Sequence, residues 1–293
     1  MTHTEVPGTT GGRIAPLTGW RGDHDYFRFA ELDRLDADAV LDVLLGRRLG
    51  VVFRGVIDAA ASAELVRRFW DSPVRKRRGG EVCESLGYYV GAYHYHKPTD
   101  RYLDESAEVA PHLDDLLDVP DEPTRWFRAE LDARLRRDGA RLRPAEQGGR
   151  PACPVLVRHW NAQGAFALQP HEDSSQLGWP EQAGFEIQRT TERVVAAVNM
   201  CLENGEGGRL VVWNVVPDLA SRTRLGLELS GSPYPVESTA GHDSLWLEVR
   251  PGDIYVFNGG HVHGVEASAP GAKRTTMAWN MGFCDDRNVV TWT

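Results

Sequence analysis

The amino-acid sequence predicts an all-β core with helical additions, arranged as a jelly roll with an N-terminal helical buttress. Short apolar runs between Gly, Pro and Asn turns fill the second half of the 293-residue chain, and helical spacing marks the first half. Many short strands without alternating helices indicate a sandwich or jelly roll. No repeat or linker interrupts the chain, so we expect one domain over residues 16–293, with its jelly-roll core at about 153–293 and a disordered tail at 1–15.

Three helices are predicted in the first half of the chain. Asp36 is a candidate N-cap before an apolar stripe at helical spacing, and Gly46 stands near the end of that helix. Asp58 caps a second helix, which must end before Pro73 because proline cannot continue it. The third helix is expected at about residues 123–137.

Strands are predicted where short apolar runs end at turn residues. The runs are residues 50–56, 155–160, 194–202, 209–213, 244–249, 253–257, 265–267 and 275–283. The glycine-rich turn at 204–208 is interpreted as a hairpin that joins its two flanking strands.

The charge and composition exclude several classes of function. The net charge of −9 argues against a nucleic-acid groove, which needs a basic surface to neutralise phosphates. No apolar run is long enough to span a membrane, and the N-terminal residues lack the apolar core of a signal peptide. The four cysteines are widely spaced, so neither a zinc site nor a disulfide framework is predicted. We therefore expect a cytoplasmic protein that acts on a small molecule, with no membrane or nucleic-acid partner and an open oligomeric state.

Histidine and acidic residues gather at two places in the second half. His171 and Asp173 stand two residues apart, so on a strand their side chains share a face and Glu172 points the other way. His263 follows a glycine-rich turn at the start of another predicted strand. Two histidines and one carboxylate on one face of an ion leave three coordination positions open, which is typical of non-haem iron(II) oxygenases. The His-x-Asp pattern alone is common, so a chance occurrence on a loop is the alternative.

The spacing between the second histidine and a following arginine is also informative. Arg274 follows His263 by eleven positions, and Thr276 lies two residues further on. A planar guanidinium suits bidentate pairing with a carboxylate, and the Thr276 hydroxyl would share its face of the strand. The pair predicts an anchor for a dicarboxylate; the alternative is an ordinary arginine at a strand end. His261 is the competing ligand, but it stands thirteen positions before Arg274.

Four motifs stand in order along the second half of the chain: His171-x-Asp173, Gly252-Asp253-x-x-x-Phe257, His263-x-Val265 and Arg274-x-Thr276. Their order resembles that of the iron(II)/2-oxoglutarate oxygenase superfamily, over about residues 153–293. The resemblance implies that superfamily's fold, a cupin-like double-stranded β-helix. It also implies that His171, Asp173 and His263 hold Fe(II), and that Arg274 with Thr276 anchors 2-oxoglutarate.

Within the superfamily, the chain looks like the small-molecule tailoring group of alkaloid and free-amino-acid halogenases and their hydroxylase relatives. The shared features are the Phe257-Asn-Gly-Gly turn and a long final strand ending in Trp292. Halogenases of this group have glycine or alanine at the position that Asp173 fills, so hydroxylation is favoured. The resemblance implies that O2 and 2-oxoglutarate give succinate and CO2 while a C–H bond of an amino acid or natural-product intermediate is hydroxylated. Desaturation, cyclisation, halogenation or a non-catalytic binding role are the alternatives.

The substrate pocket is less marked in the sequence. Arg158 and Asn161 lie on the strand before the His-x-Asp motif and are candidates for the keto-acid end or the substrate, or for ordinary polar strand positions. An aromatic stretch is the candidate pocket wall, because aromatic bodies with polar tips suit a half-wet pocket; a packed strand is the alternative. Its residues are Tyr88, Tyr89, Tyr93, His94, Tyr95 and His96. The identity of the substrate stays open.

Overall fold

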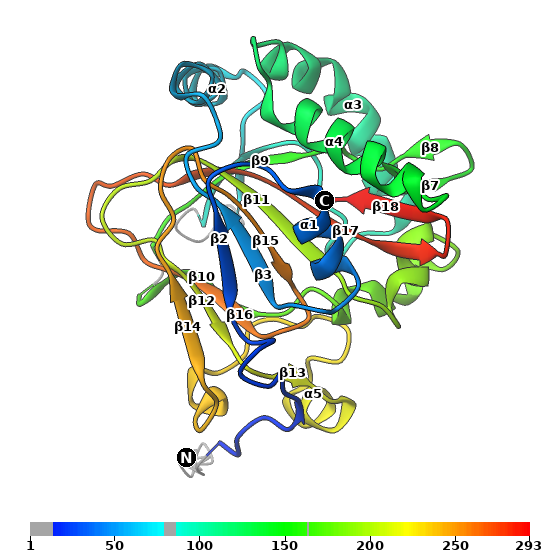
Figure 1. Cartoon of the computed structure of the whole chain (residues 1–293), viewed down its shortest axis with the longest axis vertical. Helices are drawn as coiled ribbons and strands as arrows, with labels where there is room; N and C mark the ends of the chain where they lie inside the picture. Colours follow the sequence, from blue (N-terminus) through cyan, green and yellow to red (C-terminus); the bar gives the residue numbers. More distant parts are fainter. Residues whose placement is uncertain (1–13, 79–85, 163) are drawn as a thin grey trace, which may run out of the picture.

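The computed structural model describes residues 14–78, 86–162 and 164–293 (Figure 1). Most of the tail expected at 1–15, namely residues 1–13, lies outside the described residues. Among the described residues, no helix is both long and apolar enough to cross a membrane.

Ten strands of the described chain form a large sheet that runs through the molecule. Its main path is β2 (Phe29–Leu32), β3 (Gly50–Phe53), β15 (Ile254–Asn258), β11 (Ala196–Glu203), β17 (Thr275–Asp285), β9 (Leu156–Trp160), β5 (Gly87–Val90) and β4 (Lys76–Arg78). The far half of β17 pairs with β18 (Asn288–Trp292), which runs parallel to β6 (Arg141–Pro144). The first half of the chain, expected to be mostly helical, therefore also supplies strands to both edges of this sheet.

A second sheet of four antiparallel strands is built mainly from the second half of the chain. Its order is β10 (Phe166–His171), β16 (His263–Glu266), β12 (Leu210–Trp213) and β14 (Ser244–Leu247). The remaining short elements are β1 (Gly19–Trp20), β13 (Val216–Pro217), β7 (Glu146–Gln147), β8 (Arg150–Pro151), η1 (Ser175–Gly178), η2 (Pro180–Gln182), η3 (Glu186–Thr190) and η4 (Val236–Thr239).

Strand register sorts the residues of the large sheet onto two faces. Asn199 of β11 lies opposite Tyr255 of β15 and Ala278 of β17, and Ala278 lies opposite Leu156 of β9. These four side chains therefore share one face, which looks toward the small sheet. One buried apolar cluster joins the two sheets, with Ala197, Cys201, Tyr255 and Phe257 from the large sheet and Leu210, Val212 and Leu247 from the small one.

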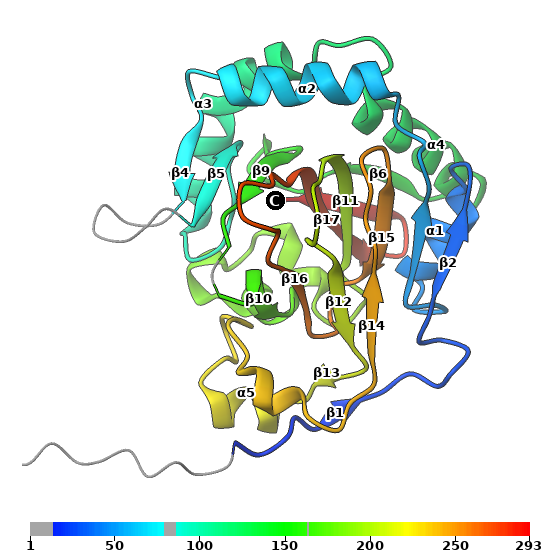
Figure 2. The same cartoon turned by 90° about the vertical axis from the view of Figure 1, so that its left-hand side faces the viewer.

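Helices cover the opposite face of the large sheet, as the sequence predicts for the buttress. The three expected helices are confirmed as α1 (Ala37–Leu44), α2 (Ala59–Asp71) and α4 (Pro123–Arg137). The predicted caps hold: the Asp36 carboxylate accepts from the backbone N–H groups of Asp38 and Ala39, and Asp58 does the same for α2. Figure 2 shows α2 running across one end of the molecule, and α5 (Leu219–Leu225) lies at the other end.

The longest helix of the described chain, α3 (Thr99–Leu117), is missing from the sequence-based prediction. Pro98 stands at its N-cap without a side-chain hydrogen bond, and Pro111 lies inside the helix. Both features normally argue against a helix. Tyr102, Val109 and other apolar residues of α3 nevertheless bury one face in the main core, so tertiary packing outweighs the local signals.

One strand prediction is wrong in its pairing. The turn at 204–208 is not a hairpin, because β11 before it belongs to the large sheet and β12 after it belongs to the small sheet. A glycine-rich turn can equally carry the chain from one sheet to another, and only long-range pairing decides between the two. The strand predicted at 275–283 is confirmed as β17, and the final strand that ends in Trp292 is a separate one, β18, that pairs with it.

Candidate active site

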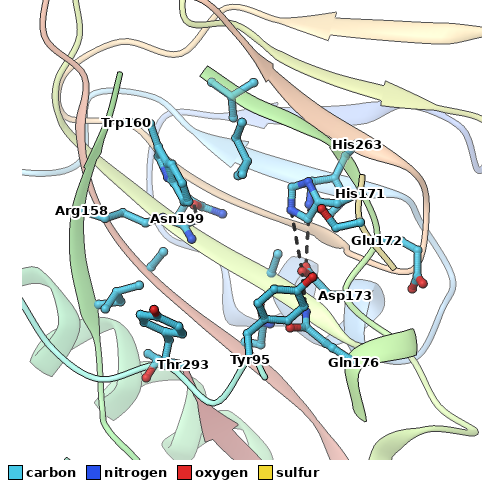
Figure 3. Close-up of a pocket in the computed structure, with 18 of the residues that line it drawn as sticks. Tyr95, Arg158, Trp160, His171, Glu172, Asp173, Gln176, Asn199, His263 and Thr293 are labelled. Atoms are coloured by element: carbon cyan, nitrogen blue, oxygen red, sulfur yellow. Dashed lines mark hydrogen bonds and ion pairs between the residues drawn. The ribbon is translucent and has the colours of Figure 1, made fainter. Parts of the chain in front are cut away.

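Three potential metal ligands converge, although they come from β10, the loop after it and β16. The ligand atoms of His171, Asp173 and His263 all lie within 4.8 Å of one another. Nε2 of His171 is 3.9 Å from one Asp173 carboxylate oxygen, and Nε2 of His263 is 3.7 Å from the other (Figure 3). His171 stands opposite His263 in the β10–β16 ladder, so strand pairing holds the two rings together.

Hydrogen bonds determine which nitrogen of each ring is available. Nδ1 of His171 lies 2.8 Å from the carbonyl oxygen of Gln169, and Nδ1 of His263 lies 2.9 Å from that of His261. A ring nitrogen that faces a carbonyl must donate, so Nε2 of each ring keeps its lone pair. Burial, aided by the His263 ring, lowers the pKa of His171 to about 3, and burial lowers the pKa of His263 to about 4. Both rings are therefore neutral near pH 7.

Contacts with the backbone of the glycine-rich turn fix the position of Asp173. The strand ends at His171, and beyond it the Asp173 N–H donates to the carbonyl of Gly259 over 2.8 Å. A Cβ on Gly259 would stand 2.4 Å from an Asp173 carboxylate oxygen, so only glycine permits this approach. Gln176 donates to the other oxygen. Burial raises the pKa of Asp173, and a divalent cation beside it would favour the ionised form.

Glu172 points away from the two ligands that flank it, as strand alternation predicts (Figure 3). Its buried carboxylate accepts hydrogen bonds from the backbone N–H groups of Ser174 and Ser175. Nε of Arg222 lies 3.8 Å from the same carboxylate. Glu172 therefore stabilises the loop that carries Asp173 and is not part of the ligand group.

His261, the competing histidine, lies outside the ligand group. Its Nδ1 lies 3.1 Å from the carbonyl oxygen of Trp213, and its ring packs among Trp20, Tyr26 and Phe27. The structure therefore brings His263, and not His261, to Asp173.

The donor set fits iron(II). Two neutral imidazole nitrogens and one carboxylate form the facial arrangement that non-haem iron(II) oxygenases use. The three residues also border a cavity of about 520 Å³ between the two sheets, so a metal ion there would face a space that can hold ligands.

Charged and aromatic side chains line the cavity together with aliphatic ones. Its lining includes Arg158, Trp160 and Asn199 across from the two histidines (Figure 3), and Leu156, Leu168, Leu210 and Val265. Tyr95 and Gln176 lie on the side of the cavity near Asp173, and Thr293 lies on the side of Arg158 (Figure 3).

Arg274 lies behind the cavity wall and is hydrogen-bonded to a tyrosine that lines the cavity. Its guanidinium is buried, donates to the Tyr255 hydroxyl over 2.7 Å and donates to the Gly208 carbonyl over 3.1 Å. Tyr255 lines the cavity, whereas Arg274 is not among the lining residues. The Thr276 hydroxyl, two residues on, is buried and has no hydrogen-bond partner in the described part of the chain. Burial raises the pKa of Tyr255, which keeps its hydroxyl protonated.

Of the two other candidates for cosubstrate binding, Arg158 lines the cavity and Asn161 does not. Arg158 lines the cavity and donates to the side-chain oxygen of Asn199 over 3.2 Å. Burial, with the charges of Arg78 and Arg274 nearby, lowers the pKa of Arg158 to about 10. Asn161 is not among the lining residues, and its side chain bonds to the His159 ring instead.

The aromatic stretch divides between the cavity and the sheet. Tyr93, His94 and Tyr95 line the cavity. Tyr88 packs on the other face of the sheet against Trp70 and His159, so the packed-strand interpretation holds for it. Tyr89 contacts the Tyr93 ring, and His96 packs against Trp179. Neither Tyr89 nor His96 is among the lining residues.

Several lining residues were missed at the level of the sequence. Trp160, Asn199, Tyr255 and Thr293 are the main ones. The first three occupy alternate positions of predicted strands, so their shared face could have been listed from period-two patterning. Which face looks into the cavity depends on the pairing of distant strands, which the sequence does not give locally.

Known enzymes are similar to this chain in sequence. No family model matches the chain. It is 31% identical over 248 residues to L-isoleucine 3(1)-dioxygenase of Pantoea ananatis, a match that covers 83% of this chain and 82% of the relative. It is 29% identical over 164 residues to L-gamma-glutamyl-L-propargylglycine hydroxylase of Streptantibioticus cattleyicolor, covering 55% of this chain and 56% of the relative.

The fold is similar to that of a solved amino-acid dioxygenase. An N-substituted L-amino acid dioxygenase from Burkholderia ambifaria superposes with a TM-score of 0.55 at 14% identity, covering 88% of this chain and 91% of that one. Its complex with alpha-KG gives a TM-score of 0.51. The chain has a His–Asp–His group beside a cavity and a dioxygenase relative along most of both sequences. It belongs to the iron(II)/2-oxoglutarate-dependent oxygenases, enzymes that hydroxylate small molecules with iron(II), 2-oxoglutarate and O2.

Proposed function

We propose that this enzyme hydroxylates the aliphatic side chain of an amino acid, either free or acylated on its nitrogen. The observation that carries the proposal is the 31% identity to a dioxygenase named for L-isoleucine. The second relative is named for a γ-glutamyl amino acid, which supports acylated substrates as the neighbouring class. Aliphatic lining residues such as Leu156, Leu168 and Val265 suit a hydrocarbon side chain.

His171, Asp173 and His263 would hold iron(II) in this proposal. Iron(II) with 2-oxoglutarate and O2 supplies the oxidation of a C–H bond to an alcohol, and 2-oxoglutarate leaves as succinate and CO2. The protein holds the two imidazoles neutral and keeps Asp173 in place through Gly259. The chemistry belongs to the cofactor, whereas orientation and the exclusion of water come from the protein.

Arg274 would anchor the distal carboxylate of 2-oxoglutarate, with Tyr255 and Thr276 beside it. The Arg274 guanidinium and the Tyr255 hydroxyl form one hydrogen-bonded unit, and Tyr255 borders the cavity. The buried Thr276 hydroxyl has no partner in the described chain and could donate to the same carboxylate. A charge-assisted pair of this kind is strong because it is shielded from water.

Hydroxylation is favoured over chlorination because Asp173 is present. Its carboxylate stands beside both histidines, where it would occupy the coordination position that a chloride ion needs. The carboxylate therefore favours oxygen transfer over chlorination.

We further propose that the two facing sheets form a double-stranded β-helix within a single domain over residues 16–293. The apolar cluster shared by both sheets supports this architecture, as does the likeness to the Burkholderia ambifaria enzyme.

The test is a panel of amino acids incubated with enzyme, iron(II), 2-oxoglutarate and O2 and analysed by mass spectrometry. The panel holds isoleucine, leucine and valine, with the γ-glutamyl and N-acetyl form of each. We expect a gain of one oxygen atom in at least one member, dependent on 2-oxoglutarate. Absence of any such product across the panel, from enzyme that binds iron(II) and 2-oxoglutarate, would overturn the proposal.

A further inference from the structure

Arg158 brings a positive charge to the cavity wall, and it forms an ion pair with no carboxylate in the described part of the chain. Its guanidinium donates to the amide oxygen of Asn199 over 3.2 Å, and its Nε is buried without a hydrogen-bond partner in the described residues. It belongs to none of the ion pairs of the described chain. Buried charges are normally paired, because leaving one unpaired costs several kcal/mol. The missing partner is therefore expected from a ligand.

A count of charges indicates that 2-oxoglutarate is not the missing partner of Arg158. Iron(II) brings two positive charges and Arg274 one, while Asp173 brings one negative charge and 2-oxoglutarate two. These charges cancel, with the distal carboxylate assigned to Arg274 and the other end of 2-oxoglutarate to the metal. Arg158 is left over as an uncompensated cation in the same cavity. Arg78 also lines the cavity, with its guanidinium over the Tyr93 and Trp160 rings, so a second anionic ligand would offset positive charge at this wall.

The position of Arg158 gives a substrate access to it. Arg158 stands on β9 opposite Thr276 of β17, and it reaches Asn199 on β11, one strand beyond. The residue of β17 that faces Asn199 is Ala278, whose small side chain leaves room for the arginine to pass over it. Trp160 lies beside Arg158, and both lie across the cavity from His171 and His263 (Figure 3).

We propose that Arg158, held in place by Asn199, binds the carboxylate of the substrate and so selects acids over amides. This inference rests on the proposed function, because it takes the substrate to be an amino acid. A planar guanidinium can take both oxygens of a carboxylate, which fixes the orientation of the molecule as well as its position. With the carboxylate held across the cavity from the two histidines, the side chain of the amino acid points toward the metal ligands.

The test compares each acid with its own amide. The ligands are L-isoleucine and N-acetyl-L-isoleucine, each with its primary amide, titrated by calorimetry into protein loaded with nickel(II) and 2-oxoglutarate so that no turnover occurs. Wild type is expected to bind each acid at least about 30-fold more tightly than its amide. Arg158→Gln should weaken acid binding by a similar factor and change amide binding less than about 3-fold. Arg158→Lys, which keeps the charge without the fork, should fall between the two.

The controls separate a binding role from a structural one. Arg34→Gln removes an exposed arginine and should leave every affinity unchanged. The melting temperature and the 2-oxoglutarate affinity of Arg158→Gln are measured in parallel, and both are expected to match wild type. An equal loss for acid and amide, or a weakened 2-oxoglutarate affinity with an unchanged acid–amide ratio, overturns the proposal. The second of these results assigns Arg158 to the cosubstrate.

The outcomes also distinguish this inference from the proposed function. Acid binding that depends on Arg158, without any oxygenated product in the presence of iron(II) and O2, supports the carboxylate site and contradicts the hydroxylation of amino acids. An oxygenated product that forms equally well from acid and amide supports the hydroxylation of amino acids and contradicts the carboxylate site. If neither acid binds to wild type, the carboxylate site is wrong.

Discussion

Arg274, the residue just before β17, and Tyr255 of β15 share a hydrogen bond of 2.7 Å across the intervening strand β11. The arginine is buried, and the tyrosine borders the cavity. The Tyr255 hydroxyl is therefore the group of this pair that borders the cavity, and the charged guanidinium of Arg274 lies directly behind it. The sequence motif points to Arg274, but the tyrosine that connects it to the cavity lies nineteen residues away.

Arg274→Gln is expected to raise the 2-oxoglutarate requirement about 30-fold or more while iron(II) affinity stays near the wild-type value. Loss of one partner of a buried charge-assisted pair costs about 2–5 kcal/mol. Tyr255→Phe, which removes only the hydroxyl, should give a smaller effect of about 1–2 kcal/mol. Titration of 2-oxoglutarate at saturating iron(II) measures both, and an unchanged affinity in Arg274→Gln would rule out the anchor role.

His171→Ala and His263→Ala are each expected to abolish tight iron(II) binding and turnover, because two remaining ligands hold the ion poorly. His261→Gln should keep iron(II) binding, since its ring packs against aromatic residues outside the ligand group. Metal content after dialysis, determined by elemental analysis, is the measurement. Loss of iron in His261→Gln with retention in His263→Ala would reverse the assignment.

Asp173 determines the expected reaction outcome. The wild type should give only oxygenated product even in abundant chloride, because the Asp173 carboxylate, which lies beside both histidines, would occupy the position that chloride needs. Asp173→Gly should lose most activity, since iron(II) loses its one anionic ligand. Product masses in chloride and in chloride-free buffer are compared for both proteins. Chlorinated product from the wild type would contradict the hydroxylase assignment.

His94 predicts a pH dependence of stability. Its ring is 2% exposed and bonds to the Gln182 side chain, and burial, with the charge of Lys97, lowers its pKa from 6.5 to about 4. The unfolded chain takes up this proton first as the pH falls, so its contribution is full above pH 6.5 and is lost toward pH 4.

The stability difference between wild type and His94→Asn should therefore shift by about 2 kcal/mol between pH 7 and pH 5, with the wild type losing more. Urea unfolding of metal-free protein at both pH values measures it. His24→Asn removes an exposed histidine and serves as the control. Parallel stability curves for wild type and His94→Asn over this range would contradict the buried neutral state of His94.

The sequence predicts those parts of the structure that depend on local signals. Asp36 and Asp58 cap helices as expected, and the spacing of His171, Asp173 and His263 identifies the three side chains that the fold brings together. The resemblance to the oxygenases adds their expected roles, and the roles of the individual residues stay predictions.

What the sequence does not predict depends on contacts between distant strands. The pairing of Arg158 with Asn199 follows from the β9–β17–β11 register, which no local pattern encodes. The turn at 204–208 has the composition of a hairpin yet connects two different sheets. Helix α3 contains Pro111, so its helical spacing is easily dismissed, although its apolar face packs in the core.

An enzyme of this family should divide the two atoms of O2 between the substrate and succinate during turnover. The enzyme is incubated with iron(II), 2-oxoglutarate, oxygen-18 gas and either L-isoleucine or its γ-glutamyl form. The masses of the amino-acid product and of succinate are then determined by mass spectrometry. We expect one heavy oxygen atom in the hydroxylated amino acid and one in succinate, with the two products formed in equal amounts. Succinate without an oxygenated amino acid, or an oxygenated amino acid that forms without 2-oxoglutarate, would contradict this expectation.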